Sequence, residues 1–199
     1  FPKGPIHINV PLREPLYSGA GEKISFSKLK RTIRVTPSSS QLSLEDKVSL
    51  GKSISKYTKI AVVGGQQLPH DAQTKSISRF CKINKTALIG DVISNLHYLP
   101  ETVRYADSFL SHCGEAIKQS LAPELLITVG KSVISKNLKL FFRHYKPKEH
   151  WHIQPHGTTA DTFQSLTRLI HCSPQNFFEG LLSPEKSDPF HEQKKKNYV

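Results

Sequence analysis

The chain has 199 residues, of which 37% are hydrophobic and 22% are charged, and 28 Lys and Arg residues stand against 16 Asp and Glu residues. This composition supplies enough apolar surface for one ordinary domain with additional tails, so we expect a soluble globule rather than a disordered chain. No apolar run approaches the roughly 20 residues that span a bilayer, and no signal peptide opens the sequence, so we expect a cytoplasmic protein with no membrane partner.

The formal charge of +12 does not by itself indicate a nucleic-acid partner. The basic residues are spread along the chain apart from Lys194–Lys196, and neither an aromatic-glycine RNA signature nor zinc-finger spacing is present. We therefore expect a solvated basic surface and no nucleic-acid binding. Three widely spaced cysteines, which form no C-x-x-C pair, are interpreted as buried thiols: Cys81, Cys113 and Cys172.

The first forty residues predict one strand and a linker. Ile6–Val10 alternates in polarity and ends at Pro11, whereas residues 17–40 are rich in Ser, Gly and Lys with weak periodicity. The chain opens with Phe1–Pro5 and contains no methionine, which suggests a fragment of a longer polypeptide. We expect the folded core to begin after residue 40.

From there strand-like and helix-like segments alternate. Four buried strands are predicted at Lys59–Val63, Thr86–Ile89, Leu125–Val129 and Trp151–Ile153, with Ile60, Val62, Leu88, Leu126 and Ile127 in the core. Helices are predicted after a Ser43 cap (Leu44, Val48, Ile54), from about Asp71 (Ile77, Phe80, Cys81), over 115–121, and from Ser135 (Leu138, Phe141, Phe142, Tyr145). This alternation implies right-handed βαβ crossovers, so we predict an α/β fold: a three-layer Rossmann-like sandwich with a mostly parallel sheet.

Parallel sheets bind ligands beyond the carboxyl ends of their strands, which directs attention to the turns after three of the predicted strands. The turn Gly64–Gly65 lacks G-x-G-x-x-G spacing, and a structural tight turn is favoured over a phosphate cradle. The turn Gly90–Asp91 lacks the second glycine and the downstream asparagine of the thiamine diphosphate motif. Neither turn predicts a cofactor site.

The turn after Val129 leads into a helix that begins near Ser135, with Lys136 and Asn137 in its first turn. Free N–H groups at a helix start carry partial positive charge, and a lysine adds a full charge, which suits a carboxylate or phosphate. The alternative is that Ser135 only caps the helix while Lys136 points into solvent. Local sequence leaves both interpretations open.

Three histidines surround Trp151 near the end of the last predicted strand, at His150, His152 and His156. Residues two apart on a strand project to one face, which is a possible metal geometry. No carboxylate or cysteine completes a ligand set, so we interpret them as polar histidines at a strand end.

Four stretches together resemble one enzyme family, and the resemblance spans roughly residues 4–180. They are Gly4–Leu16 (GPIHINVPLREPL), Ala87–Ser94 (ALIGDVIS), Pro123–Gly130 (PELLITVG) and Ser135–Leu138 (SKNL). The chain resembles the central domain of the thiamine-diphosphate-dependent 2-succinyl-5-enolpyruvyl-6-hydroxy-3-cyclohexene-1-carboxylate synthases of menaquinone biosynthesis.

This resemblance implies four segments. Residues 1–16 would end a preceding pyrimidine-binding domain, 17–40 would be a linker, 41–182 the central α/β domain, and 183–199 a linker toward a diphosphate-binding domain.

The full-length enzymes of this family are homo-oligomeric transferases that decarboxylate 2-oxoglutarate on thiamine diphosphate, anchored by Mg²⁺, and add the succinyl unit to isochorismate. The resemblance places the activating glutamate and the Gly-Asp-Gly metal motif in the neighbouring domains. It therefore implies that this chain alone binds no cofactor or metal and is inactive.

The resemblance assigns to this domain scaffolding and a contact with a substrate carboxylate near Ser135. Lys136 matches the lysine of a basic pair in the family, and Asn137 stands where an arginine is expected. The competing interpretation is a nucleotide-binding or regulatory Rossmann-like module without catalysis, which Gly64–Gly65 would carry.

Overall fold

A computed structural model describes Asn9, residues 32–36 and residues 41–182 of the chain. Most of the predicted first strand, Ile6–Val10, and the segment 183–199 lie outside these described residues. Residues 32–182 belong to a single compact unit. Within the described ranges no helix is both long enough and apolar enough to cross a bilayer.

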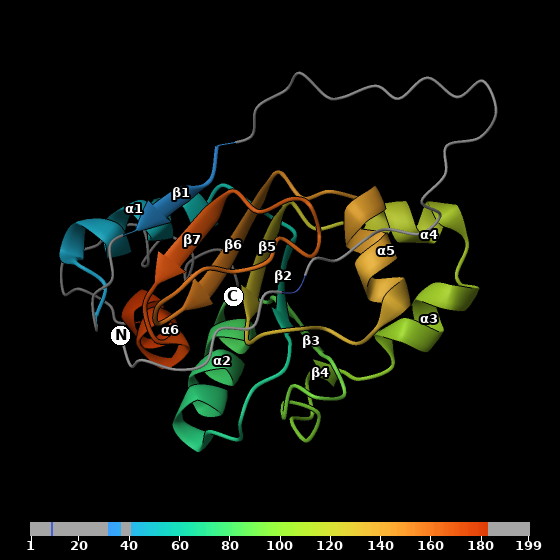
Figure 1. Ribbon diagram of the computed structural model, residues 1–199, viewed down its shortest axis with the longest axis horizontal. Coiled ribbons are helices and arrows are strands. Elements are labelled where there is room, and N and C mark those ends of the chain that lie inside the picture. Colours follow the sequence, from blue (N-terminus) through green and yellow to red (C-terminus); the bar gives the residue numbers. More distant parts are fainter. Residues whose placement is uncertain (1–8, 10–31, 37–40, 183–199) are drawn as a thin grey trace, which may run out of the picture. The chain divides into compact units, whose positions relative to one another are not determined.

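The described unit is built on one sheet with seven strands, all paired in parallel, in the order β1-β7-β6-β5-β2-β3-β4 (Figure 1). The strands are β1 (Arg34–Thr36), β2 (Ile60–Gly64), β3 (Ala87–Gly90), β4 (Thr102–Val103), β5 (Leu125–Val129), β6 (Glu149–Gln154) and β7 (Arg168–His171). The predicted mostly parallel sheet is confirmed. It follows from the crossover helices, because each returns the chain to the same edge of the sheet.

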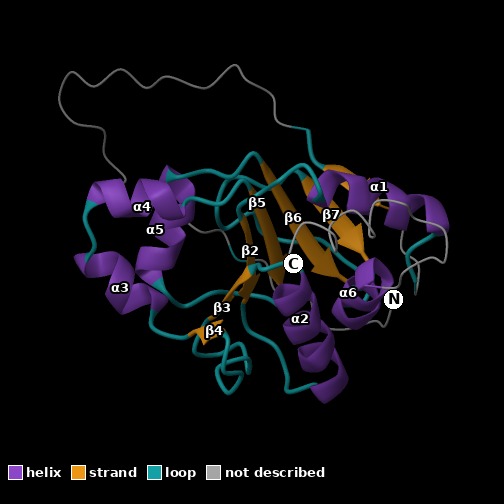
Figure 2. Ribbon diagram, turned by 180° about the vertical axis from the view of Figure 1, so that it is seen from behind, coloured by secondary structure: helices purple, strands orange, loops and turns teal. Residues whose placement is uncertain are grey.

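Six described helices form the outer layers: α1 (Leu44–Ile54), α2 (Asp71–Ile83), α3 (Ala106–His112), α4 (Glu115–Leu121), α5 (Lys136–His144) and α6 (Pro174–Leu182). One apolar core joins a sheet face to α1, α2 and α6, and a second core joins the opposite face to α3 and α5 (Figure 2). This is the predicted three-layer sandwich. Alternate strand residues divide between the two cores, with Val62 and Ile127 in the first and Val63 and Leu126 in the second.

The predicted helix starts agree closely with the structure. Ser43 caps α1 by accepting a hydrogen bond from the Asp46 backbone N–H at 3.0 Å, and Ser135 caps α5 through the Leu138 N–H at 3.1 Å. α2 begins at Asp71, although its cap is the imidazole of His70. Capping chemistry is local, which is why a single sequence predicts it well.

The structure corrects the sequence interpretation at its weakest signals. Three short strands were not predicted, and one of them, β1, lies inside the expected linker 17–40. Leu44 and Val48 are exposed on the outer face of α1, whereas the buried residues of this helix are Leu50 and Ile54. Ile60 is only partly buried, because it begins β2 at the rim of the sheet. Strands of two to four residues carry too little alternation to be recognised.

Candidate functional site

The strand order reverses at β2, which places the turns after β2 and β5 side by side at the carboxyl edge. β2 pairs with β5 on one side and with β3 on the other. The chain then leaves β2 for α2 on one face and leaves β5 for α5 on the opposite face. Such a reversal opens a crevice in parallel α/β sheets, so this edge is the candidate site.

Backbone contacts between the two turns close this crevice. The N–H of Gly65 donates to the Val129 carbonyl at 2.9 Å, that of Gln66 to Ser132 at 2.8 Å, and that of Lys131 to Gln66 at 2.8 Å. None of these three donors is left for a phosphate. The cavity beside them measures about 30 Å³, which is room for water and not for a nucleotide.

The Gly64–Gly65 turn is therefore a structural turn, as its spacing predicted, and the contacts give no support to a nucleotide module carried by it.

Two histidines of the predicted trio, His150 and His152, line that small cavity and are buried. The side-chain amide of Gln154 donates to the Gly157 carbonyl at 2.9 Å, which leaves its oxygen to accept from His152 Nε2 at 3.2 Å. The Nδ1 of His152 lies 2.8 Å from the Thr128 hydroxyl oxygen, and that hydroxyl also lies within hydrogen-bond distance of the Trp151 carbonyl, at 3.3 Å. Burial of the ring lowers the pKa of His152.

His150 continues the same chain of hydrogen bonds from the other side of Thr128. Its Nε2 lies 2.9 Å from the Thr128 hydroxyl oxygen, and its Nδ1 lies 3.1 Å from the Ser165 hydroxyl oxygen. His156 is exposed and does not join them. Among the residues that the structure describes, no group of three or more His, Cys, Asp or Glu is arranged to hold a metal ion. The two buried histidines instead link β5 to β6 and to the loop before β7.

The predicted substrate-contact residues lie together at the start of α5. Lys136 is the first helical residue and is exposed, and no partner within the described residues is recorded for its ammonium group. Ser135 and Asn137 are partly buried on either side of it. All three residues lie next to the point where the strand order reverses.

Carboxylates from elsewhere in the chain accept hydrogen bonds from the backbone N–H groups of Ser135 and Asn137 at this helix start. Asp107 of α3 accepts at Oδ1 from the Ser135 hydroxyl and from the Asn137 N–H at 3.0 Å. Its Oδ2 accepts from the Asn137 side-chain amide at 3.1 Å. The hydrogen bonds from Ser135 and from the Asn137 backbone hold the pKa of Asp107 below its ordinary value.

A second carboxylate, that of Asp91 after β3, secures the loop that leads into α5. Its Oδ2 accepts from the N–H groups of Ile134 at 2.9 Å and Ser135 at 3.0 Å. The expectation that free N–H groups attract an outside anion is therefore wrong for these donors, since internal carboxylates satisfy them. At the helix start itself, an external anion would meet the exposed side chain of Lys136.

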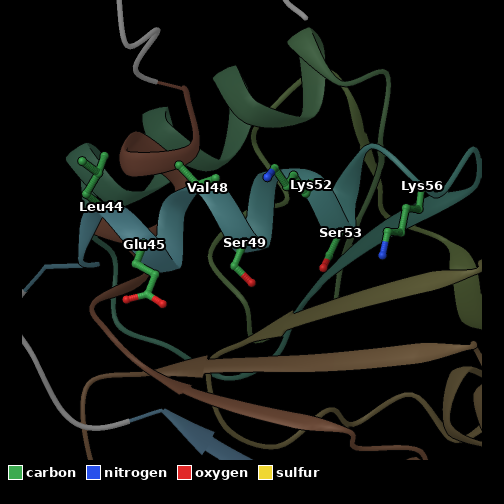
Figure 3. Close-up of a pocket in the computed structure, with 7 residues that line it drawn as sticks. All are labelled: Leu44, Glu45, Val48, Ser49, Lys52, Ser53 and Lys56. Atoms are coloured by element: carbon green, nitrogen blue, oxygen red, sulfur yellow. The ribbon is translucent and has the colours of Figure 1, made fainter. Parts of the chain in front are cut away.

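A larger hollow, of about 690 Å³, runs along the outer face of α1 (Figure 3). Glu45, Ser49 and Ser53 point to one side of the helix there, while Leu44 and Val48 point to the other. No residue of the strand-end turns lines this hollow. It contains none of the predicted site residues.

Residues 41–196 match the protein family described as "Middle domain of thiamine pyrophosphate". The chain belongs to this family. The match covers most of the sequence, and the all-parallel sheet with helices on both faces is the architecture expected of this middle domain. The inference that the chain is the central domain of a thiamine-diphosphate enzyme is thereby confirmed.

The proteins to which the chain is similar belong to one group of enzymes. This middle domain is 36% identical over 177 residues to a 2-succinyl-5-enolpyruvyl-6-hydroxy-3-cyclohexene-1-carboxylate synthase from Cytophaga hutchinsonii, a match covering 89% of this chain and 31% of the relative. Synthases of the same name from Flavobacterium johnsoniae and Porphyromonas gingivalis are 31% and 34% identical, covering 90% and 94% of this chain and 32% of each relative. The chain spans about a third of the length of these relatives.

The described residues of the middle domain do not fit thiamine diphosphate and its metal ion. Asp91 is the aspartate of the Gly90–Asp91 pair, and both of its carboxylate oxygens accept hydrogen bonds within the chain. Oδ1 accepts from the Ile93 N–H at 3.3 Å, and Oδ2 accepts from the N–H groups of Ile134 and Ser135. The Gly64–Gly65 donors are occupied as well. The carboxylate of Asp91 and these backbone donors are therefore not free to bind the cofactor.

Sequence reasoning missed the two aspartates that hold α5. Asp91 carried a weak signal, because it follows directly after a buried strand at the edge where sites form. Asp107 carried none, since it lies in a short helix whose packing against α5 cannot be recognised from local pattern.

Proposed function

We propose that this middle domain is part of a synthase that decarboxylates 2-oxoglutarate on thiamine diphosphate and adds the succinyl unit to isochorismate in menaquinone biosynthesis. The support is the identity of 31–36% with synthases of that name over 89–94% of the chain. In this proposal, thiamine diphosphate and Mg²⁺ bind to other domains of a cytoplasmic, homo-oligomeric transferase.

Within that enzyme the domain's contribution is a scaffold and a positive charge for a substrate carboxylate. Both substrates are carboxylic acids, and the ammonium group of Lys136 is exposed at the carboxyl edge. The observation that carries the proposal is that the backbone N–H groups on either side of Lys136 already donate to Asp91 and Asp107. Lys136 is therefore the residue at this helix start whose side chain offers a full positive charge to a dianionic substrate.

Ser135 and Asn137 belong to the same site in a supporting role. The Ser135 hydroxyl donates to Asp107 and accepts from the Leu138 N–H, and the Asn137 amide donates to Asp107. A neutral amide in the place of the family's arginine removes one charge and supplies a partner for Asp107. These two residues hold the start of α5 in this proposal.

The test is an assay of the complete enzyme expressed from the full reading frame. We expect release of CO₂ from 2-oxoglutarate that depends on thiamine diphosphate and Mg²⁺, and formation of the succinylated product when isochorismate is added. A purified, folded enzyme that performs neither reaction would show that the synthase assignment is wrong.

The alternative of a nucleotide-binding module has no contact in its favour. The melting temperature of the chain, measured with and without nucleotides and flavins, separates the two functions. Because the N–H groups of the turn are already bonded, we expect no stabilisation, whereas a nucleotide-binding module would be stabilised.

A further inference from the structure

Lys136 is flanked on both sides by backbone that two separate carboxylates hold in place. On the N-terminal side, Asp91 accepts from the N–H groups of Ile134 and Ser135. On the C-terminal side, Asp107 accepts from the Asn137 N–H. We propose that Asp91 and Asp107 are positioning residues that fix Lys136 toward the substrate carboxylate, an inference that rests on the proposed function.

Asp91 is a rigid anchor because it is itself buried and held by the sheet. Its side chain is part of a residue that is only 5% exposed, and its backbone N–H donates to the Gly64 carbonyl at 3.1 Å. Burial of a carboxylate is costly unless hydrogen bonds offset the lost hydration, and here three backbone N–H groups do so. The loop before α5 is thereby tied to the ends of β2 and β3.

Asp107 fixes the other side by joining α3 to the first turn of α5. Both of its oxygens are used, one by the Ser135 hydroxyl and the Asn137 N–H, the other by the Asn137 amide at 3.1 Å. α3 and α5 also share the apolar core on this sheet face, through Leu110 and Leu138. The helix start is therefore held from the core side and from the neighbouring helix together.

This arrangement reduces the entropy cost of a lysine contact. A lysine side chain has several rotatable bonds, so a mobile backbone beneath it would add further freedom that substrate binding has to remove. Fixing the residues on both sides of Lys136 lets the ammonium group meet the carboxylate in a prepared position. The cost is electrostatic, because two negative charges lie near a site for an anion.

That electrostatic cost makes the proposal testable, since charge and position predict opposite results. By charge alone, Asp107→Ala removes a negative group and strengthens binding of a dianion. By positioning, the same change loosens Lys136 and weakens binding. In the full-length synthase we expect Asp107→Ala to raise the KM of the substrate that Lys136 contacts by roughly three- to tenfold, with a smaller change in kcat.

The conservative variant and a double mutant separate positioning from a general structural effect. Asp107→Asn keeps one oxygen for the Asn137 N–H, so we expect its KM to lie close to that of the wild type. In a Lys136→Ala background, Asp107→Ala should add little, because the group that it positions is absent. Both oxygens of Asp91 accept from backbone N–H groups, so Asp91→Asn turns an NH2 group against one of these donors. It should therefore raise the same KM, without an additional effect in the Lys136→Ala background.

The matched control is Asp71→Asn, an exposed aspartate at the start of α2 that forms no hydrogen bond with the described residues of α5. It should leave both kinetic constants unchanged. Fully additive losses in the double mutants, or tighter substrate binding in Asp107→Ala, would overturn the positioning role. A loss in Lys136→Ala with no change in either aspartate variant would overturn it too, and would leave the proposed function intact. Unchanged kinetics in Lys136→Ala would instead remove the proposed substrate contact.

Discussion

Gly130 lies directly against the backbone of Gly65, from the neighbouring strand-end turn. A Cβ atom added to Gly130 would stand 2.8 Å from the Gly65 carbonyl oxygen, and one added to Gly65 would stand 2.5 Å from the Lys131 carbonyl oxygen. Gly130 also has a φ of +80°, which side chains rarely adopt. The closed crevice between β2 and β5 therefore depends on glycine in both turns.

We predict that Gly130→Ala lowers the free energy of unfolding by roughly 1–3 kcal/mol, because both the backbone angle and the close approach oppose a side chain. Urea unfolding followed by circular dichroism measures this. Gly51→Ala is the matched control, since it lies in the interior of α1 with no atom within 4 Å of the added carbon. It should stabilise the protein by about 0.5–1 kcal/mol. A Gly130→Ala variant as stable as the wild type would contradict the tight contact.

The buried imidazole of His152 predicts a loss of stability in mild acid. Because the folded-state pKa of His152 lies below its ordinary value of 6.5, the unfolded chain binds the proton first as pH falls. The stability from the neutral ring is fully present above about pH 6.5 and declines as pH falls toward the lower folded-state pKa.

Unfolding free energies measured at about pH 7.5 and about pH 5.5 should differ less in His152→Gln than in the wild type. Glu124 does not interfere, because its hydrogen bond from Lys148 lowers its pKa to about 2 and keeps it ionised across this range. Equal pH dependence in the two proteins would show that His152 is not the titrating group.

In the full-length enzyme, Lys136→Ala should reduce kcat/KM while the fold and thiamine diphosphate binding change little. The loss of one charge-assisted hydrogen bond costs about 1.5–3 kcal/mol, or roughly ten- to a hundredfold. Asn137→Ala should cost less, because its amide contacts Asp107 and carries no charge. Lys139→Ala, one turn further along α5, is the control and should behave like the wild type. Circular dichroism checks the fold of each variant.

The chain alone should fold and show no synthase activity. It spans about a third of the length of its relatives, and its described residues do not fit the cofactor. The measurement is product formation from 2-oxoglutarate and isochorismate with thiamine diphosphate and Mg²⁺ added to the purified chain. Turnover above that of a heat-denatured sample would disprove the assignment of the chemistry to other domains.

Several features were predictable because they depend on residues close together in the chain. The caps Ser43 and Ser135 each bind an N–H three residues away, and the apolar run Leu125–Val129 is a strand buried on both faces. Alternation of such strands with helices is enough to predict a parallel sheet. The sequence stretches that resemble the synthase family likewise lie within short windows.

The sequence by itself therefore determined the fold class, the family and the place of Lys136 at a helix start. Only the tertiary structure decided how that helix start is satisfied. Asp91 reaches Ser135 across 44 residues and Asp107 reaches Asn137 across 30, so no local pattern contains either contact. A helix N-terminus attracts whichever anion lies within reach. Only the tertiary fold, which packs α3 against α5 and brings the turn after β3 to the loop before α5, places the chain's own carboxylates there.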